Sequence, residues 1–147
     1  MEYIMSTILK LSNGNVIALA DVKTLQPINE EEQTKLGERL EIDGSQFNTR
    51  ITLANKSTQL ARETVDQLKA QGVGLVDLGD DRFVPAANIM VAKPFSKEQA
   101  DALSKKGYKL GQTFQATVET TAGIVLATGK PQQVMDRKVR AMGLTNG

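Results

Sequence analysis

The stretch that decides the fold covers residues 11–29 and reads LSNGNVIALADVKTLQPIN. Residues 78–96 read LGDDRFVPAANIMVAKPFS and follow the same plan 67 residues later, without a gap. Both stretches pass from a turn through a β-type run to a proline and an apolar residue, and both end on a good helix N-cap, Asn29 or Ser96. The agreement of turn, strand, proline and cap in one register predicts that the chain repeats one structural unit.

The same register extends further, where Phe47 falls on Phe114. We therefore predict a single domain over residues 1–147, built from two tandem repeats at about 6–72 and 73–143. Neither repeat is long enough for a comfortable core of its own, so we expect the two to share one core across a pseudo-two-fold axis. Exact identities are few, and the alternative is that two ordinary α+β segments share their spacing.

Turn and cap signals divide the first repeat into short elements. Asn13-Gly14 predicts a hairpin turn between two β-type runs, and Asn29 with Glu32 three residues later begins a short helix. Ser57 caps the clearest helical pattern of the chain. The predicted elements are strands at 6–11 and 15–22, a helix after residue 29, a second hairpin formed by 39–42 and 47–54, and a long helix over 57–71.

The second repeat carries similar signals. Ser96 and Gln99 form a capping-box pattern that begins a helix ending at Gly107, and Pro131 occupies a favourable first-turn position of the last helix. Short strands broken by turns predict an α+β fold, in which a mixed or antiparallel sheet carries helices on one face. The strands expected in this repeat are 73–78, 83–92, 114–119 and 124–128.

The composition excludes much of enzyme chemistry, because the 147 residues include no His, no Cys and no Trp. Thiolate nucleophiles, histidine bases and zinc sites built from these residues are therefore ruled out. Asp77, Asp80 and Asp81 are the best candidate ligands for a divalent cation, but they lack the spacing of an EF-hand, so we interpret them as a solvated turn. We predict a protein that is not an enzyme and that needs no metal or cofactor.

The charges nearly balance, since 18 Lys and Arg stand against 17 Asp and Glu and leave a net charge of +1. Such a balance provides no overall field to draw in DNA or an anionic membrane. No secretion signal opens the chain, and no run reaches the ~18–20 apolar residues of a membrane span. We predict a soluble protein of the cytoplasm, or of the host cytoplasm if the chain is viral, without a membrane partner.

Basic residues concentrate on the last predicted helix. Arg137 and Arg140 share one face of it at a spacing of i, i+3, Lys138 lies between them, and Lys130 precedes the helix. Cations near a helix C-terminus also stabilise the helix dipole, which is the structural alternative. As a binding site, the two guanidinium groups would grip a phosphate in a bidentate manner, and Lys130 would add charge at a helix N-terminus.

Arg82 and Phe83 form a second candidate pair. Adjacent residues of a regular strand point to opposite faces, so one of the two could stack on a base while the other packs inside. Core packing is the alternative for Phe83. The equivalent repeat positions of Phe47 and Phe114 favour core packing for both of these rings.

Two stretches resemble the RemA-type extracellular matrix regulators, which are small oligomeric DNA-binding proteins. The first runs from Arg50-Ile51-Thr52-Leu53 through the predicted Ser57 helix to Gly72 and Val76-Asp77, and the second reads GIVLATGKPQQVMDR over residues 123–137. This resemblance implies an oligomeric transcriptional regulator. In its compact size, its missing catalytic groups and its C-terminal Arg pair, the chain also resembles in type the phage Thoeris anti-defence proteins, which sequester cyclic-nucleotide immune signals.

These observations leave three functions open. The first is a non-enzymatic, homo-oligomeric binding protein, a phage-type sponge for a small phosphate-bearing signal such as a cyclic nucleotide. The alternative is a RemA-like regulator that binds DNA, which the net charge disfavours, and the third is a structural or partner-binding module. The residues expected to bind the small anionic ligand are Arg137, Arg140, Lys138, Lys130, Arg82 and Phe83.

Overall fold

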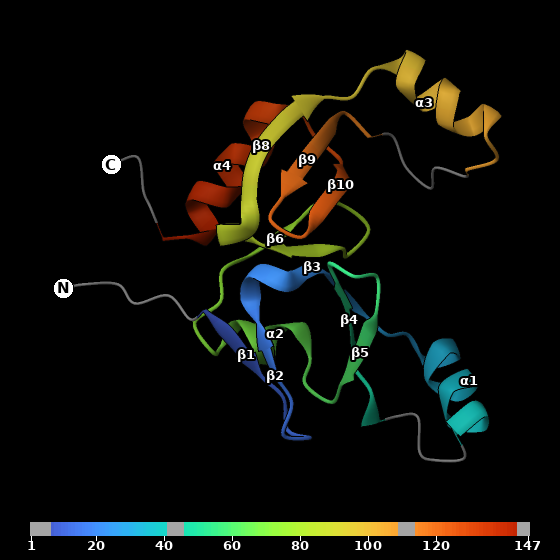
Figure 1. Ribbon diagram of the computed structural model, residues 1–147, viewed down its shortest axis with the longest axis vertical. Coiled ribbons are helices and arrows are strands. Elements are labelled where there is room, and N and C mark those ends of the chain that lie inside the picture. Colours follow the sequence, from blue (N-terminus) through green and yellow to red (C-terminus); the bar gives the residue numbers. More distant parts are fainter. Residues whose placement is uncertain (1–6, 41–45, 109–113, 144–147) are drawn as a thin grey trace.

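The computed structural model describes residues 7–40, 46–108 and 114–143 of the chain. Within these ranges the fold is α+β and every strand pair is antiparallel, which confirms the predicted class (Figure 1). None of the helices in the described part of the chain has the length and apolar character needed to cross a bilayer.

The first half begins with a hairpin whose loop contains Gly14 at a φ of 93°, a left-handed conformation that suits glycine. Its first long helix starts where the sequence predicts, because the Asn29 side chain accepts a hydrogen bond from the Glu32 amide at 2.8 Å. The elements of this half are β1 (Ile8–Lys10), β2 (Val16–Ala18), the 3₁₀ helix η1 (Leu19–Asp21), β3 (Val22–Pro27), α1 (Glu30–Leu40), β4 (Thr49–Leu53), β5 (Thr58–Ala61) and α2 (Val65–Lys69).

The second half presents the same kinds of element in the same order. Ser96 and Gln99 make the predicted capping box, and Pro131 opens the last helix. The elements are β6 (Leu75–Asp77), β7 (Phe83–Pro85), the 3₁₀ helix η3 (Ala86–Asn88), β8 (Ile89–Pro94), α3 (Lys97–Lys105), β9 (Ala116–Thr120), β10 (Gly123–Ala127) and α4 (Pro131–Ala141).

The 67-residue offset also holds for strand register. β1 pairs Ile8 with Ala18, and β6 pairs Leu75 with Pro85 in the same arrangement. The β3–β4 ladder has a register irregularity after Val22, and the β8–β9 ladder has one at the equivalent place, after Ile89. The halves thus share element order and pairing, while their origin by duplication stays a prediction.

The strands form three hydrogen-bonded sheets. A five-stranded sheet has the order β5-β4-β3-β7-β6, a three-stranded sheet the order β10-β9-β8, and β1 pairs with β2 alone. The halves meet where β7 lies beside β3, with Phe83 opposite Leu25. The predicted two-fold relation would also pair β2 with β8, but these two strands share no ladder within the described residues. The second half therefore adds a strand to the first half, and the first half adds none to the second.

Two clusters of buried side chains replace the single shared core that the repeat predicts. The first is built mainly by the first half, with Leu9, Leu25, Ile51 and Leu68 fully buried, and Phe83 packs against it. The second runs from Val76 to Val134 and belongs to the second half. The buried side chains therefore form two clusters and not one shared core, although Val73, Leu75 and Phe83 of the second half join the first cluster.

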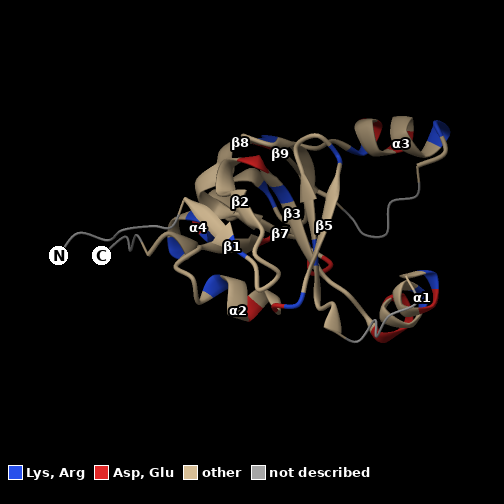
Figure 2. Ribbon diagram, turned by 60° about the horizontal axis from the view of Figure 1, so that its bottom comes forward, with Lys and Arg blue, Asp and Glu red and all other residues tan. Residues whose placement is uncertain are grey.

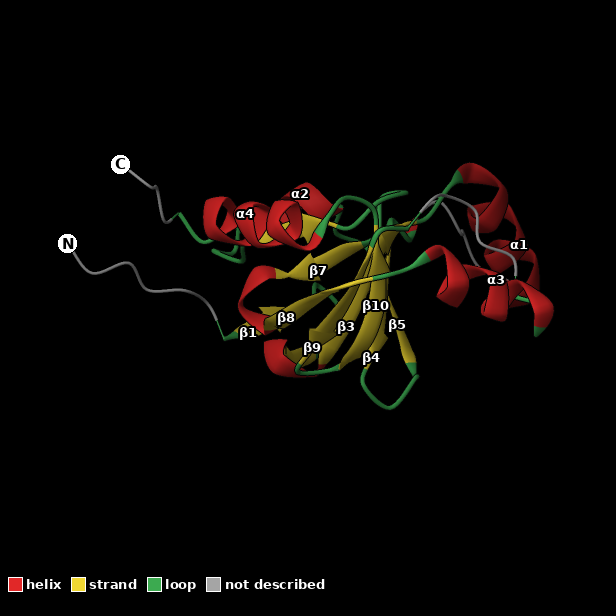
Figure 3. Ribbon diagram, turned by 90° about the horizontal axis from the view of Figure 1, so that it is seen from above, coloured by secondary structure: helices red, strands yellow, loops and turns green. Residues whose placement is uncertain are grey.

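The helices lie at two places around the strands. Figure 3 shows α2 and α4 on one side of the strands, whereas α1 and α3 project away from the strands, well apart from each other in Figure 1. α4 is anchored by the fully buried Val134, but α3 buries none of its residues. The helices that pack on the strands are therefore α2 and α4.

The predicted Ser57 helix is wrong. Asn55 accepts a hydrogen bond from the Ser57 amide, and the chain turns back through Lys56 at a φ of 70°. Residues 58–61 then form β5 against β4, and α2 starts at a capping box made by Thr64 and Gln67. Pairing with the preceding strand β4 outweighs the local helical pattern here.

The predicted hairpin at 39–42 and 47–54 also differs from the structure. Arg39 and Leu40 belong to α1, and β4 pairs with β3 and β5 instead. The Asp43-Gly44 turn of that prediction lies outside the described residues.

Candidate functional site

α4 carries the predicted arginine pair and is held in place at its first turn. Gly129, at a φ of 91°, redirects the chain after β10, and Pro131 occupies the first turn. The Lys130 amide donates to the Gln133 side chain at 2.8 Å, which closes the N-terminus. These contacts and the buried Val134 fix which face of the helix Arg137 and Arg140 present.

Arg137 lies against the ends of two strands. Its Nη1 donates to the Thr128 carbonyl at 3.0 Å and to the Asp77 carbonyl at 3.3 Å. A Cβ on Gly129 would overlap Nη2 of Arg137, so a larger residue there would displace the guanidinium group from this position. Arg137 is therefore half-buried and held in one orientation before any ligand arrives.

A surface depression of about 600 Å³ opens beside this guanidinium group. We call it the α4 depression; its lining includes Asp77, Gly79, Thr128, Arg137, Arg140 and Ala141. Arg140 is exposed, with its Nε 3.5 Å from the Asp136 carbonyl. The structure thus brings both arginines of the predicted pair to one concave surface, and Figure 2 shows the basic segments of α4.

Asp77 contributes a carboxylate to this lining, and its negative charge opposes the binding of an anion. Its Oδ1 accepts a hydrogen bond from the Gly79 amide at 2.7 Å, as expected for a turn-forming Asp. The predicted role of the Asp77–Asp81 segment as a turn agrees with this contact. Asp80 and Asp81 both adopt a φ of 56° in the same turn.

Arg82 supports the strands instead of lining the α4 depression. Its Nη2 donates to the Leu126 carbonyl at 2.8 Å, its Nε lies 3.3 Å from the Gly79 carbonyl, and its guanidinium group stands 5.0 Å from the centre of the Phe114 ring. Burial lowers the pKa of Arg82 below its usual value, while the charges of Asp80 and Asp77 act in the opposite direction. Arg82 therefore ties the turn to β10.

The other three predicted residues lie elsewhere. Phe83 pairs with Leu25 and packs against the first cluster, which is the core alternative. Lys138 donates from Nζ to the Ile89 carbonyl at the start of β8, and Lys130 is exposed outside the lining. Of the six predicted residues, Arg137 and Arg140 are the two that line the α4 depression.

The main-chain carbonyls of this site were not predicted from the sequence. The carbonyls of Asp77 and Thr128 orient Arg137, and they carry no side-chain signature. Gly74 offered an indirect signal, because a Cβ there would overlap the Ala141 carbonyl at the end of α4. A glycine without a turn marks such a close approach of two backbones.

A second depression, of about 310 Å³, lies at the other end of the 79–82 turn. Its lining includes Asp80, Asp81 and an ion pair in which Arg50 contacts Glu32 at 2.7 Å. Across residues 7–40, 46–108 and 114–143, no three acidic, His or Cys side chains are placed to hold a metal ion. Its carboxylates make this surface a poorer place for an anion than the α4 depression.

Comparison with models of known protein families, with curated proteins and with solved structures gives no match to this chain.

Proposed function

We propose that this protein is a non-enzymatic, homo-oligomeric binding protein that captures a small phosphate-bearing ligand in the α4 depression. The observation that carries the proposal is that two guanidinium groups, Arg137 and Arg140, line one concave surface. Arginine presents several N–H donors in a plane that matches phosphate oxygens, and so suits this ligand class.

The two arginines would contribute in different ways. Arg137 already donates to two carbonyls through Nη1, so its position costs little side-chain entropy when a ligand binds. Arg140 is exposed and would close on the ligand from the solvent side. With Arg137 held in place and Arg140 exposed, a ligand would first contact Arg137 and would then be covered by Arg140.

The size of the site favours a small molecule over a nucleic acid duplex. A depression of about 600 Å³ falls within the ~300–1,000 Å³ range of small-molecule sites. A duplex needs a long run of cations, and Lys138 is directed to β8 instead. A cyclic nucleotide used as a signal fits these limits, which would make the protein a sponge of the phage anti-defence kind.

Isothermal titration calorimetry tests this proposal with a panel of cyclic nucleotides and inorganic phosphate as probes. We expect at least one cyclic nucleotide to bind, and we expect Arg137→Gln with Arg140→Gln to weaken binding at least 100-fold, since each charged hydrogen bond contributes about 1.5–3 kcal/mol. Arg62→Gln removes an equal charge from an exposed position outside the depression and is the matched control.

Equal binding by the double variant and the wild type would contradict the proposal. Binding of duplex DNA that weakens steeply with salt, without binding of any cyclic nucleotide, would support the DNA-binding alternative. Binding of neither class would leave the partner-binding module.

A further inference from the structure

The two halves differ in how one strand edge is covered. On one side of β3 lies β4, and on the other lies β7 from the second half. The counterpart of β3 is β8, which has β9 on one side and no ladder partner on the other within the described strands. The counterpart of β7 is β2, whose one ladder partner among the described strands is β1. The unpaired edge of β8 therefore corresponds to the edge of β3 that β7 covers. The unpaired edge of β2 corresponds to the edge of β7 that pairs with β3.

Both unpaired edges expose apolar side chains. Val16 on β2 is 60% exposed, and on β8 Met90 is 54% and Val91 is 40% exposed. At the covered edge the situation is reversed, since Leu25 is fully buried where Phe83 packs on it. Exposed apolar edge strands are sites of pairing with another chain.

We propose that β2 of one copy of this protein adds to the open edge of β8 of a second copy, as β7 adds to β3 within the chain. Moving the internal pair Leu25–Phe83 by the repeat offset places Val16 of the second copy opposite Ala92. α4 packs against β8 as α2 packs against β3, and η1 of the same chain packs against η3, directly before β8. The new pair would cover the exposed residues of both edges.

The polar contacts beside the internal pair indicate the same partner. Asn88 donates from Nδ2 to the Leu19 carbonyl at 2.8 Å and to the Val22 carbonyl at 3.0 Å. The residue equivalent to Asn88 is the exposed Asp21, and the carbonyl equivalent to Val22 is that of Ile89.

A carboxylate does not donate to a carbonyl, but the Ile89 carbonyl already binds the ammonium group of Lys138. Asp21 of the second copy would therefore meet Lys138, opposite charge to opposite charge. The contact within the chain is made by the neutral Asn88 side chain, and the proposed contact between copies is made by the oppositely charged Asp21 and Lys138. Each polar group then has a partner.

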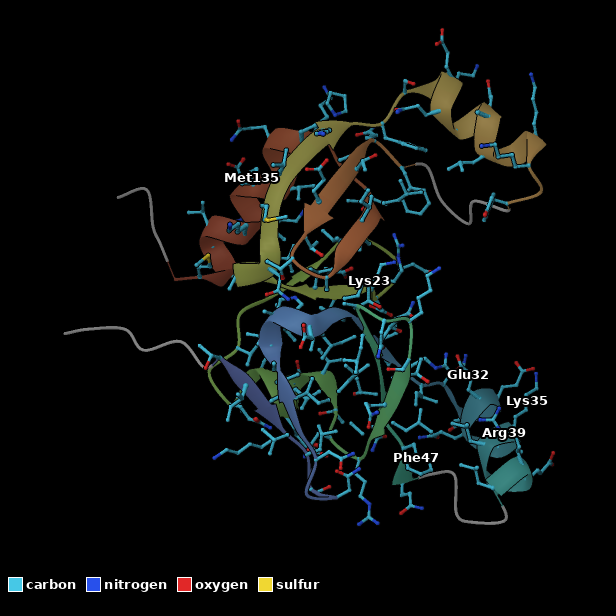
Figure 4. All side chains as sticks on the ribbon, in the orientation of Figure 1. Lys23, Glu32, Lys35, Arg39, Phe47 and Met135 are labelled. Atoms are coloured by element: carbon cyan, nitrogen blue, oxygen red, sulfur yellow. The ribbon has the colours of Figure 1, made fainter. Side chains whose placement is uncertain are left out.

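Met90, an apolar residue next to this contact on β8, is also placed to be covered by a second copy. Lys23 lies at the junction of the halves, where its stem passes 3.3 Å from the position of a Cβ on Gly123 (Figure 4). Its counterpart on β8 is Met90, which has solvent in place of that neighbour. A second copy would cover Met90 as the second half covers the stem of Lys23. Because the contact joins two different edges, repeated pairing would close into a ring or extend as a filament.

Cysteine cross-linking tests this pairing directly, because the natural chain contains no Cys. Val16→Cys and Ala92→Cys are prepared as separate full-length variants and mixed under oxidising conditions. We expect a disulfide between the two, since directly opposite residues of an antiparallel pair come within bonding range. Ile124→Cys mixed with Ala92→Cys is the control, because Ile124 is 61% exposed but lies on β10, at the opposite edge of the three-stranded sheet from β8.

Mass measurement by multi-angle light scattering completes the test. We expect the wild type to form assemblies, Val16→Asp to reduce them to monomers, and Ile124→Asp to leave them intact. We also expect Asp21→Lys and Lys138→Asp each to weaken assembly, and the two together to restore it. A monomeric wild type, equal cross-linking by the Ile124→Cys control, or an unchanged mass for Val16→Asp would overturn the inference.

The inference rests on the self-association part of the proposed function and is independent of its ligand. Calorimetry on the Val16→Asp variant separates the two. If that variant is monomeric and binds the cyclic nucleotide as the wild type does, the edge and the α4 depression act separately. If the wild type binds the ligand as a monomer, the edge pairing fails while the ligand site stands.

Discussion

Asn88 is the side chain whose loss we expect to loosen the contact between the halves most. It is 3% exposed, and its amide group donates to two carbonyls of the first half, those of Leu19 and Val22. Replacement by Ala removes both hydrogen bonds and places no new group there. The variant therefore reports directly on how firmly the second half is tied to the first.

The expected loss follows from the fate of the two carbonyls. A hydrogen bond contributes about 1 kcal/mol net, and a buried acceptor left without a partner costs about 1–3 kcal/mol. The Leu19 carbonyl keeps the Val22 amide as a donor, so the free-energy cost at this carbonyl lies at the low end of that range. We expect Asn88→Ala to lower the free energy of unfolding by about 2–4 kcal/mol, or the Tm by roughly 4–16 °C.

Urea unfolding followed by circular dichroism measures this change. Asn15→Ala is the matched control, because Asn15 is exposed and its side chain bonds the half-buried Gln59 side chain of the same half. The control should change the free energy by less than about 0.5 kcal/mol. A similar change for both variants would refute the view that Asn88 joins the halves. A second unfolding transition in Asn88→Ala alone would show that the two buried clusters then unfold separately.

Three further changes test single contacts. Gly74→Ala places a Cβ on the Ala141 carbonyl, so the end of α4 must shift; we expect a loss of about 1–3 kcal/mol in thermal unfolding, and no loss would mean that α4 packs less closely. Thr49→Val keeps the side-chain shape but removes the donor to the Glu63 carbonyl at 2.7 Å; chemical denaturation should show a loss of about 1–2 kcal/mol, against no change if that carbonyl finds another donor. Ser96→Ala removes the cap of α3, a helix that buries no residue, so amide exchange should rise within α3 while the Tm stays within about 2 °C; a larger fall in Tm would place α3 in the core.

The signals that the sequence carried correctly are local. Asn29, Ser96 and Pro131 begin helices because a cap or a fixed φ acts on the next few residues alone. The Ser57 helix failed although its competitor is also local. Residues 58–61 form a hairpin with β4 through a short turn at Asn55 and Lys56, and the helical spacing of the apolar residues hid this turn.

The candidate site divides in the same way. The spacing of Arg137 and Arg140 on one helix was enough to predict that they share one surface, whereas their binding of a ligand stays a prediction. The depression beside them depends on the ends of β6 and β10 meeting, where the Thr128 amide donates to the Leu78 carbonyl, although the two strands belong to different sheets. Strand alternation left Phe83 open to stacking or core packing, and its partner Leu25, 58 residues away, places it in the core.

The one-way contact between the halves restricts the stoichiometry of any closed assembly. A ring built by the proposed pairing contains two structural units per chain, so its unit count is always even. Contacts between units alternate around such a ring. The contact within each chain includes the neutral Asn88, and the contact between chains includes the charged pair of Asp21 and Lys138. High salt weakens the second kind and spares the first, so such a ring would come apart into whole chains with their two units still docked.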